Sequence, residues 1–556
     1  MDSSWESSGN IPSLELSSAA QLPDGSTCLA SSEDGAYLGL GHAHGLSVWR
    51  ACPPVCDAEW LQDELEITSI QMTGAAEAAY LLGTVDDMGV ARVFAFHNKS
   101  IHLLSVVNTM EDINNRSICS TFELSQGGHY GAASFSCNSA CWLEIYRFPL
   151  KAWVKELAGS QTEDPDSPYV SVKWSLLSME AKMKPPKISA GQPDVPQTAD
   201  FLTFCLAQDV DTRHQQRDGQ KGKTMETPEG PRRCTQHFLL PCARFHDDCT
   251  ETSRPELPVA VCLWWSGSHN LLQYELQKAS TKKKSTDAPP DVLLPNAKRI
   301  LCSAVSGCTR YIALGLDDAV VCVWDRKCGS PLSVLAVAAD GPFFRMHFVD
   351  NWPVSADDSQ TFNAAQVHLL VTCKSGDIHA VTADRGMQSC SVLLLKRPED
   401  SADLPSVTVL LPFLHCLMLV VQRSGKLHLH DVINNKSVCL LAAPKAHLIA
   451  SPCKPVFTLN IKQQTLYIRG DQGHSSSSTE INHSRLLLLR FGQCEVLKPY
   501  VVTFPHYSHN KTQSFATLEE ACNQYLQQRT LSVHERNKAI TQTWKQLQER
   551  RDDAAS

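Results

Sequence analysis

Residues 299–337 constrain the fold more than any other stretch, because four short apolar runs follow one another there with turn-forming residues between them. The runs are rich in β-branched residues and are bounded by Gly, Asp, Ser or Thr, a pattern typical of strands joined by tight turns. The third run ends in Trp324-Asp325. The stretch therefore predicts one small sheet of four strands, with which the rest of the chain can be compared.

Strand–turn–strand patterns of the same kind recur at intervals of about 45–60 residues, except for one longer interval. Self-similarity at this spacing is typical of sheets repeated around a ring. Eight such hairpins are visible, which favours eight four-stranded units within an allowed range of seven to nine. Their inner turns lie near residues 41, 86, 138, 267, 317, 375, 424 and 470.

The hairpins share residues at corresponding positions. Cys28 stands nine residues before Tyr37, just as Cys302 stands nine residues before Tyr311. The segment 80–94 is a third copy, with an aromatic residue in the tryptophan position, and a later hairpin carries an aspartate in the Asp place of the Trp-Asp pair. The predicted markers of the repeat are Tyr37, Trp49, Tyr80, Phe94, Tyr311, Trp324, Asp325 and Asp431.

A third strand that closes with Trp-Asp resembles a WD repeat, which is one blade of a β-propeller. We therefore expect an all-β, WD-repeat-like propeller over residues 15–505, preceded by a flexible N-terminus at 1–14. Polar segments at about 159–200, 209–233 and 278–292 predict surface loops or disordered insertions, because they cannot bury enough apolar surface to fold by themselves. The sequence leaves open to which blade each strand-like run between the insertions belongs.

The C-terminal tail, residues 512–556, changes from strand to helical spacing. Thr517 to Glu520 and Ser532 to Glu535 are capping-box patterns, each of which predicts the start of a helix. The apolar positions then follow the period of an amphipathic helix. This stripe must be buried, either on the flank of the propeller or against a partner protein. Its candidate binding residues are Leu518, Tyr525, Val533, Ile540, Trp544 and Leu547.

Composition limits the classes of partner and compartment. A net charge of −9 gives no overall field that would hold nucleic acid or an anionic membrane. No apolar stretch approaches the ~18–20 residues that span a bilayer, and the first residues lack a secretory pattern. We therefore expect a cytosolic chain whose 22 cysteines are reduced and serve mostly as small apolar residues in strands.

One group of residues could bind zinc, namely Cys234, His237, Cys242, His246 and Cys249. Thiolates and imidazoles at these spacings can reach one tetrahedral ion. The apolar run within 237–240 reads as a strand, however, and alternation along a strand would divide the ligands between its two faces. Whether 234–249 binds zinc stays open, and the sequence predicts no catalytic residues and no cofactor.

The whole chain resembles the WD repeat-containing protein 93 family, a divergent WD-repeat family. In this sequence only the repeat at Trp324-Asp325 has an intact Trp-Asp pair. The resemblance implies a non-enzymatic scaffold in the central apparatus of the motile-cilium or flagellum axoneme. Its partners would be other axonemal proteins, with an association with microtubules through a complex. Alternatives are an accessory protein linked to mitochondrial electron transport and complex I, or a cytosolic WD-repeat adaptor.

Overall fold

The computed structural model describes the chain from residue 11 to residue 501, apart from several gaps. Residues 502–556 form a separate unit that lies outside the described residues. The gaps are residues 77, 139, 340 and 446 and the segments 160–172, 186–232, 242–256, 277–289, 350–365, 385–388 and 473–483.

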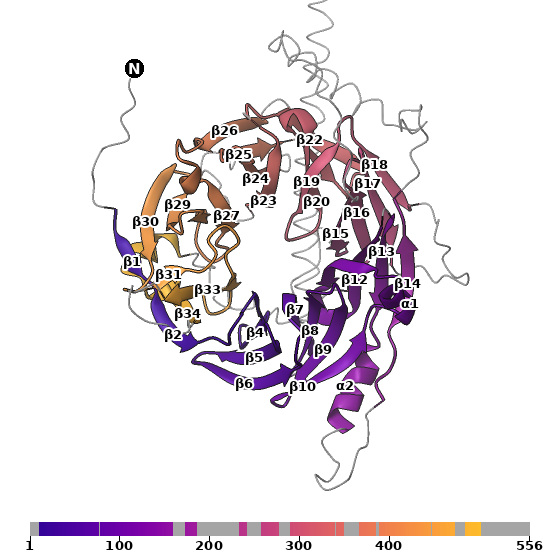
Figure 1. Cartoon of the computed structure of the whole chain (residues 1–556). Coiled ribbons are helices and arrows are strands. Elements are labelled where there is room, and N and C mark those ends of the chain that lie inside the picture. Colours follow the sequence, from indigo (N-terminus) through magenta and orange to yellow (C-terminus); the bar gives the residue numbers. More distant parts are fainter. Residues whose placement is uncertain are drawn as a thin grey trace, which may run out of the picture. The chain divides into compact units, whose positions relative to one another are not determined.

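The described residues fold into eight sheets with antiparallel core strands, and in seven of them the four core strands are consecutive in the chain. Short apolar runs rich in Val, Ile and Leu form the two middle strands of each sheet, where both faces are buried. The sheets are arranged around a central opening (Figure 1). The prediction of an eight-bladed β-propeller is thus confirmed.

The first four blades carry the longest insertions and both α-helices found among the described residues. Helix α1 (Met110–Asn114) joins blades 2 and 3, and α2 (Leu150–Gly159) precedes the last strand of blade 3. The strands are, for blade 1, β3 (Cys28–Ser31), β4 (Tyr37–His42), β5 (Gly45–Ala51) and β6 (Pro54–Leu61); for blade 2, β7 (Ile67–Ala76), β8 (Ala79–Asp86), β9 (Ala91–His97) and β10 (Ser100–Val106); for blade 3, β11 (Ile118–Leu124), β12 (Tyr130–Cys137), β13 (Ala140–Arg147) and β14 (Ser178–Met183); and for blade 4, β15 (Cys234–Leu239), β16 (Ala260–Trp265), β17 (Asn270–Glu275) and β18 (Val292–Pro295).

The last four blades include the reference repeat as blade 5. Their strands are, for blade 5, β19 (Ile300–Val305), β20 (Tyr311–Leu316), β21 (Val320–Asp325) and β22 (Ser330–Ala336); for blade 6, β23 (Phe343–Phe348), β24 (Val367–Cys373), β25 (Ile378–Ala383) and β26 (Cys390–Leu395); for blade 7, β27 (Pro405–Leu410), β28 (Leu417–Gln422), β29 (Leu427–Asp431) and β30 (Lys436–Ala442); and for blade 8, β31 (His447–Ile449), β32 (Phe457–Asn460), β33 (Thr465–Gln472) and β34 (Ser484–Arg490).

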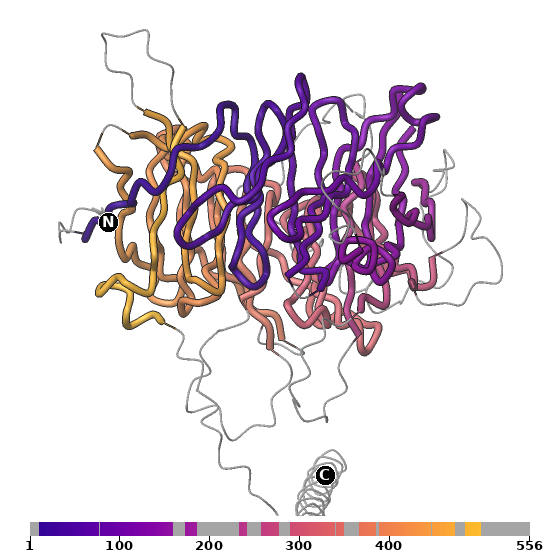
Figure 2. Tube along the Cα trace, turned by 90° about the horizontal axis from the view of Figure 1, so that it is seen from below, coloured from indigo at the N-terminus to yellow at the C-terminus, as the bar shows by residue number. Residues whose placement is uncertain are grey.

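Strands from the N-terminus complete the ring. Strand β2 (Ser17–Gln21) pairs antiparallel with β34 and becomes the outer strand of blade 8. Strand β1 (Ser13–Glu15) pairs in parallel with β30 as a fifth strand of blade 7. In Figure 2 this first segment, in indigo, lies against the last strands. The prediction of a flexible segment 1–14 needs correction at its end, because β1 begins at Ser13; residues 1–10 lie outside the described residues.

The hydrophobic core is divided among the eight contacts between neighbouring blades. Each of eight buried clusters joins two consecutive blades. The cluster of Leu38, Trp49, Tyr467 and Leu488 joins blade 8 to blade 1. Because every pair of neighbours shares such a cluster, the ring is closed by side-chain packing as well as by strand pairing.

The predicted insertion at 159–200 contains a strand that the sequence did not reveal. Strand β14 pairs with β13 and completes blade 3. Its Lys182 lies 2.8 Å from the buried carboxylate of Glu144, which also accepts a hydrogen bond from Trp142. A buried carboxylate needs such partners, and this explains why a polar strand belongs there. The insertions at 209–233 and 278–292 fall mostly outside the described residues.

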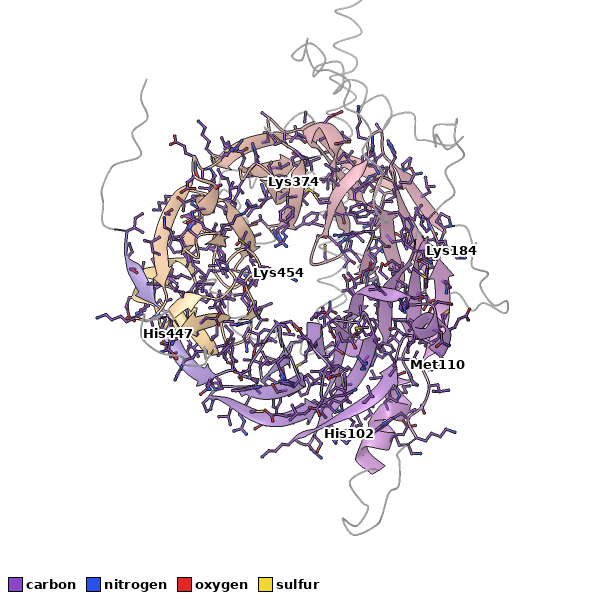
Figure 3. All side chains as sticks on the ribbon, viewed as in Figure 1. His102, Met110, Lys184, Lys374, His447 and Lys454 are labelled. Atoms are coloured by element: carbon purple, nitrogen blue, oxygen red, sulfur yellow. The ribbon has the colours of Figure 1, made fainter. Side chains whose placement is uncertain are left out.

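Blade 8 departs from the regular pattern. The predicted turn near residue 470 lies inside β33, which continues to Gln472. Both β31 and β32 pair with this same strand, so its inner neighbour is interrupted between Ile449 and Phe457. Figure 3 shows Lys454, which belongs to the interruption, in the central opening.

Candidate interaction surfaces

The Trp-Asp pair of blade 5 is a packing and turn device. The Trp324 side chain is 2% exposed, in the cluster between blades 4 and 5, and its Nε1 donates to Oδ1 of Asn296 at 3.2 Å. A large side chain held between two sheets contributes to their docking. The structure therefore gives this predicted marker a structural role.

Asp325 and Asp431 have the same structural role in two different blades. Asp325 accepts the Lys327 amide and the Arg310 guanidinium, and Asp431 accepts the Ile433 amide, all at about 3 Å. Burial by itself would raise the pKa of Asp325, but the hydrogen bonds, first of all from Arg310, lower it. Each carboxylate thus stabilises the turn that follows its strand.

Trp49 occupies in blade 1 the register of Trp324. Trp49 pairs with Leu38, the residue after Tyr37, as Trp324 pairs with the residue after Tyr311. Its indole Nε1 donates to Ser47 at 2.8 Å. The neighbouring Arg50, at the Asp position, forms an exposed ion pair with Asp57.

Blade 2 differs from the alignment of the repeats. Tyr80 pairs with Phe96 and packs toward blade 1, where its ring meets Tyr37 edge-on at 5.2 Å between centroids. Phe94 is fully buried in the same cluster but pairs with Leu82, further along the strand. The alignment is shifted because turn lengths differ between blades, and the sequence alone does not fix the register.

The described part of the zinc candidate does not converge. Cys234 packs toward blade 3, whereas the His237 imidazole contacts Oγ of Ser303 in blade 5 at 2.8 Å. Alternation along β15 sends the two side chains to opposite faces. Cys242, His246 and Cys249 lie outside the described residues. Within the described ranges no group of three or more His, Cys, Asp or Glu side chains could hold a metal ion.

Most described cysteines inside strands are buried, as predicted. Cys322, Cys373 and Cys439 are at most 2% exposed. Burial raises the pKa of Cys322 to about 12. These side chains act as small apolar residues. None of the helices in the described part of the chain is long and apolar enough to cross a membrane.

One exposed surface was not predicted from the sequence. Apolar side chains gather where the β8–β9 turn meets the connection from β10 through α1 to β11, and Met88 is 73% and Met110 71% exposed. Figure 3 places Met110 at the outer rim of the ring. A methionine inside a polar turn at 86–89 was the signal that could have found it. We call this surface the blade 2–3 patch and define it by Met88, Val106, Met110, Ile113 and Ile118.

The predicted partner-binding tail lies outside the described residues, including all of its candidates: Leu518, Tyr525, Val533, Ile540, Trp544 and Leu547. Its role stays a prediction.

Comparison with known proteins gives a family. A family model described as WD repeat-containing protein 93 matches residues 26–321, more than half of the chain. Sqt1 of Chaetomium thermophilum is similar at a TM-score of 0.48 and 11% identity, over 86% of this chain and 98% of that one. Sqt1 of Saccharomyces cerevisiae is similar at a TM-score of 0.44 and 9% identity, over 85% and 97%.

Proposed function

Because the chain belongs to the family of WD repeat-containing protein 93, we propose that it is a non-enzymatic interaction scaffold in the central apparatus of the motile-cilium or flagellum axoneme. The observation that carries the scaffold role is the closed ring, in which every blade packs on both neighbours. A propeller closed in this way is a rigid support whose connecting loops are free to contact other proteins.

The polar residues of the repeats support the same reading. Asp325 and Asp431 are engaged with the turns that follow their strands. Asp86 likewise accepts the Val90 amide of the following turn at 2.7 Å and pairs with Arg92 of β9. Carboxylates used in this way maintain the shape of the platform.

The proposed partners are other axonemal proteins, and contact with microtubules runs through their complex. Resemblance to the family supports this placement in the cytoskeleton of the cilium.

The test is the location of the full chain in ciliated cells. A tagged full-length chain should remain with the detergent-extracted axoneme and be lost from axonemes that lack the central pair. A matched variant without residues 512–556 should be retained less, if the tail contacts partners. Recovery in mitochondria would contradict the proposal in favour of the electron-transport accessory, and recovery only in soluble cytosol would favour the adaptor.

A further inference from the structure

We propose that the blade 2–3 patch is a docking site for a basic amphipathic helix of a partner protein, an inference that rests on the scaffold function proposed above. Three observations carry it: the backbone beneath the patch is fixed, the side chains on it are apolar and exposed, and the acidic groups around it have no ion-pair partner within the described ranges.

The backbone of the patch is held by one buried side chain. The Asn108 amide accepts from the Ala91 amide at 2.8 Å and donates to the Gly89 carbonyl at 3.2 Å. A capping box between Thr109 and Asp112 fixes the start of α1. The surface is therefore formed before a partner arrives, which reduces the entropy lost on binding.

The apolar side chains lie on this fixed base. Gly89 has a positive φ of 74°, and an added Cβ would lie 2.4 Å from Cγ2 of Ile118, so the turn and β11 are in direct contact. Met88 precedes this glycine, and Ile118 itself is 52% exposed. Unbranched methionines adapt to the shape of an incoming apolar face, and exposed apolar groups that gather in this way mark an interaction site.

The neighbouring charges are nearly all negative. Asp87 lies in the β8–β9 turn, and its amide donates to the carbonyl of Glu66 at 2.9 Å, which ties the connection between blades 1 and 2 to the patch. Arg116 is the basic residue of the α1 connection. Among the described residues, no ion pair is found for the acidic side chains of these segments, namely Asp63, Glu64, Glu66, Asp87 and Glu111.

Hydrogen bonding favours a helical ligand over an added strand. The Val107 amide already donates to Ala91 and the Cys119 amide to Gly89, both at 2.8 Å. At these two positions an extended peptide would therefore find no free backbone amides to pair with. A helix needs none, because it presents apolar residues at i, i+3, i+4 and i+7 to the patch and Lys or Arg to the acidic surroundings.

The experiment uses the full chain and two synthetic helical peptides of about 18 residues, long enough for several turns. Both carry leucines at i, i+3, i+4 and i+7; the other positions are mostly lysine in one peptide and glutamate in the other. Fluorescence anisotropy should show binding of the lysine peptide, weakened by added salt, and much weaker binding of the glutamate peptide.

Two variants test the patch directly. Asp87→Lys with Glu111→Lys should weaken the lysine peptide about tenfold and strengthen the glutamate peptide, because two attractive contacts become repulsive. Met88→Ala with Met110→Ala should weaken both peptides. The matched control, Val392→Ala with Glu399→Lys, changes exposed residues of blade 6 and its following connection and should leave binding unchanged. Circular dichroism checks that each variant is folded.

Equal binding of the two peptides, or no effect of the charge reversal, would overturn the proposal. So would peptide binding by a chain without residues 512–556 but not by the full chain, since the occupant would then be the chain's own tail. Peptide binding needs no cilium. A chain that binds the lysine peptide yet is absent from axonemes refutes the central-apparatus proposal alone, and an axonemal chain without this binding refutes only the docking site.

Discussion

The structural role of a single residue in this propeller depends on its contacts with neighbouring blades and strands. Trp324 is packed between two blades, and Asp325 beside it holds the turn that leads to the next strand. Both could be predicted from the sequence, because tryptophan and aspartate at the end of an apolar run are distinctive. Glu144 could not, because its importance arises from a lysine 38 positions further along the chain, as their numbers show.

Replacing Trp324 by alanine should lower the free energy of unfolding by roughly 3–5 kcal/mol, because the change leaves a large cavity between blades 4 and 5. Urea denaturation measures the effect. Leu448→Ala is the control: Leu448 is 65% exposed, so this change should stay within about 0.5 kcal/mol. A near-zero value for Trp324→Ala would contradict the packing described here.

Buried histidines should make the fold sensitive to mild acid. Burial lowers the pKa of His237 and of His347 to about 4, below the ordinary 6.5. Between pH 6.5 and 4 the unfolded chain therefore binds protons that the folded chain does not, so stability should fall as the pH falls through this window. The loss is at most about 1.4 kcal/mol per pH unit for each histidine.

The comparison of thermal midpoints at pH 7.5 and pH 5 checks this expectation. His237→Gln can still bond to Ser303, and it should show a smaller fall between the two values than the unchanged chain. The measurement at pH 7.5 separates this effect from a simple loss of packing. An identical pH dependence in both proteins would contradict the role given to His237.

At the scale of elements, the hairpins could be read from the sequence and the closing strands could not. A hairpin can be recognised within one short segment of the sequence, because two apolar runs flank a turn only a few residues long. Strands β1 and β2 are three and five residues long, and their partners lie at the other end of the chain. No sequence pattern near residue 17 indicates that this residue pairs with Leu488.

Leu16→Ala should destabilise the protein by about 2–5 kcal/mol, because this side chain, between β1 and β2, is 1% exposed in the cluster between blades 7 and 8. Thermal unfolding and limited proteolysis should both report a looser ring. Ile11→Ala, which changes a residue that is 47% exposed, should have little effect. If the two variants behaved alike, the N-terminal strands would not be what fastens the ring.

At the scale of the whole molecule, the features that repeat along the chain are the ones that could be predicted from the sequence. Eight blades followed from the spacing of the turns, since each blade repeats the same local chemistry. The blade 2–3 patch did not, because the turn that carries Met88 and Gly89 meets Ile118 only when two blades are set side by side. The sequence therefore predicts the platform better than the surfaces it presents.

Residues 1–505 should fold alone, because the described blades form one compact unit that ends at Val501. The shortened chain should keep a β-rich circular dichroism spectrum and a thermal midpoint close to that of the full chain. Its retention in axonemes is a separate measurement, which depends on partners. Aggregation of the shortened chain would show that residues 506–556 are needed for folding as well.

The pairing of β2 with β34 has a consequence for how the protein is made. Ser17 leaves the ribosome 471 residues before its partner Leu488, counted from their numbers. At usual rates of synthesis this delay lasts roughly half a minute to a minute and a half. Until then the backbone N–H and C=O groups of the first strands stay unpaired while the other blades are synthesised and fold. During this time these strands can pair with other nascent chains. Chaperones that shield emerging edges should therefore matter more for this protein than for one whose first strand finds its partner at once.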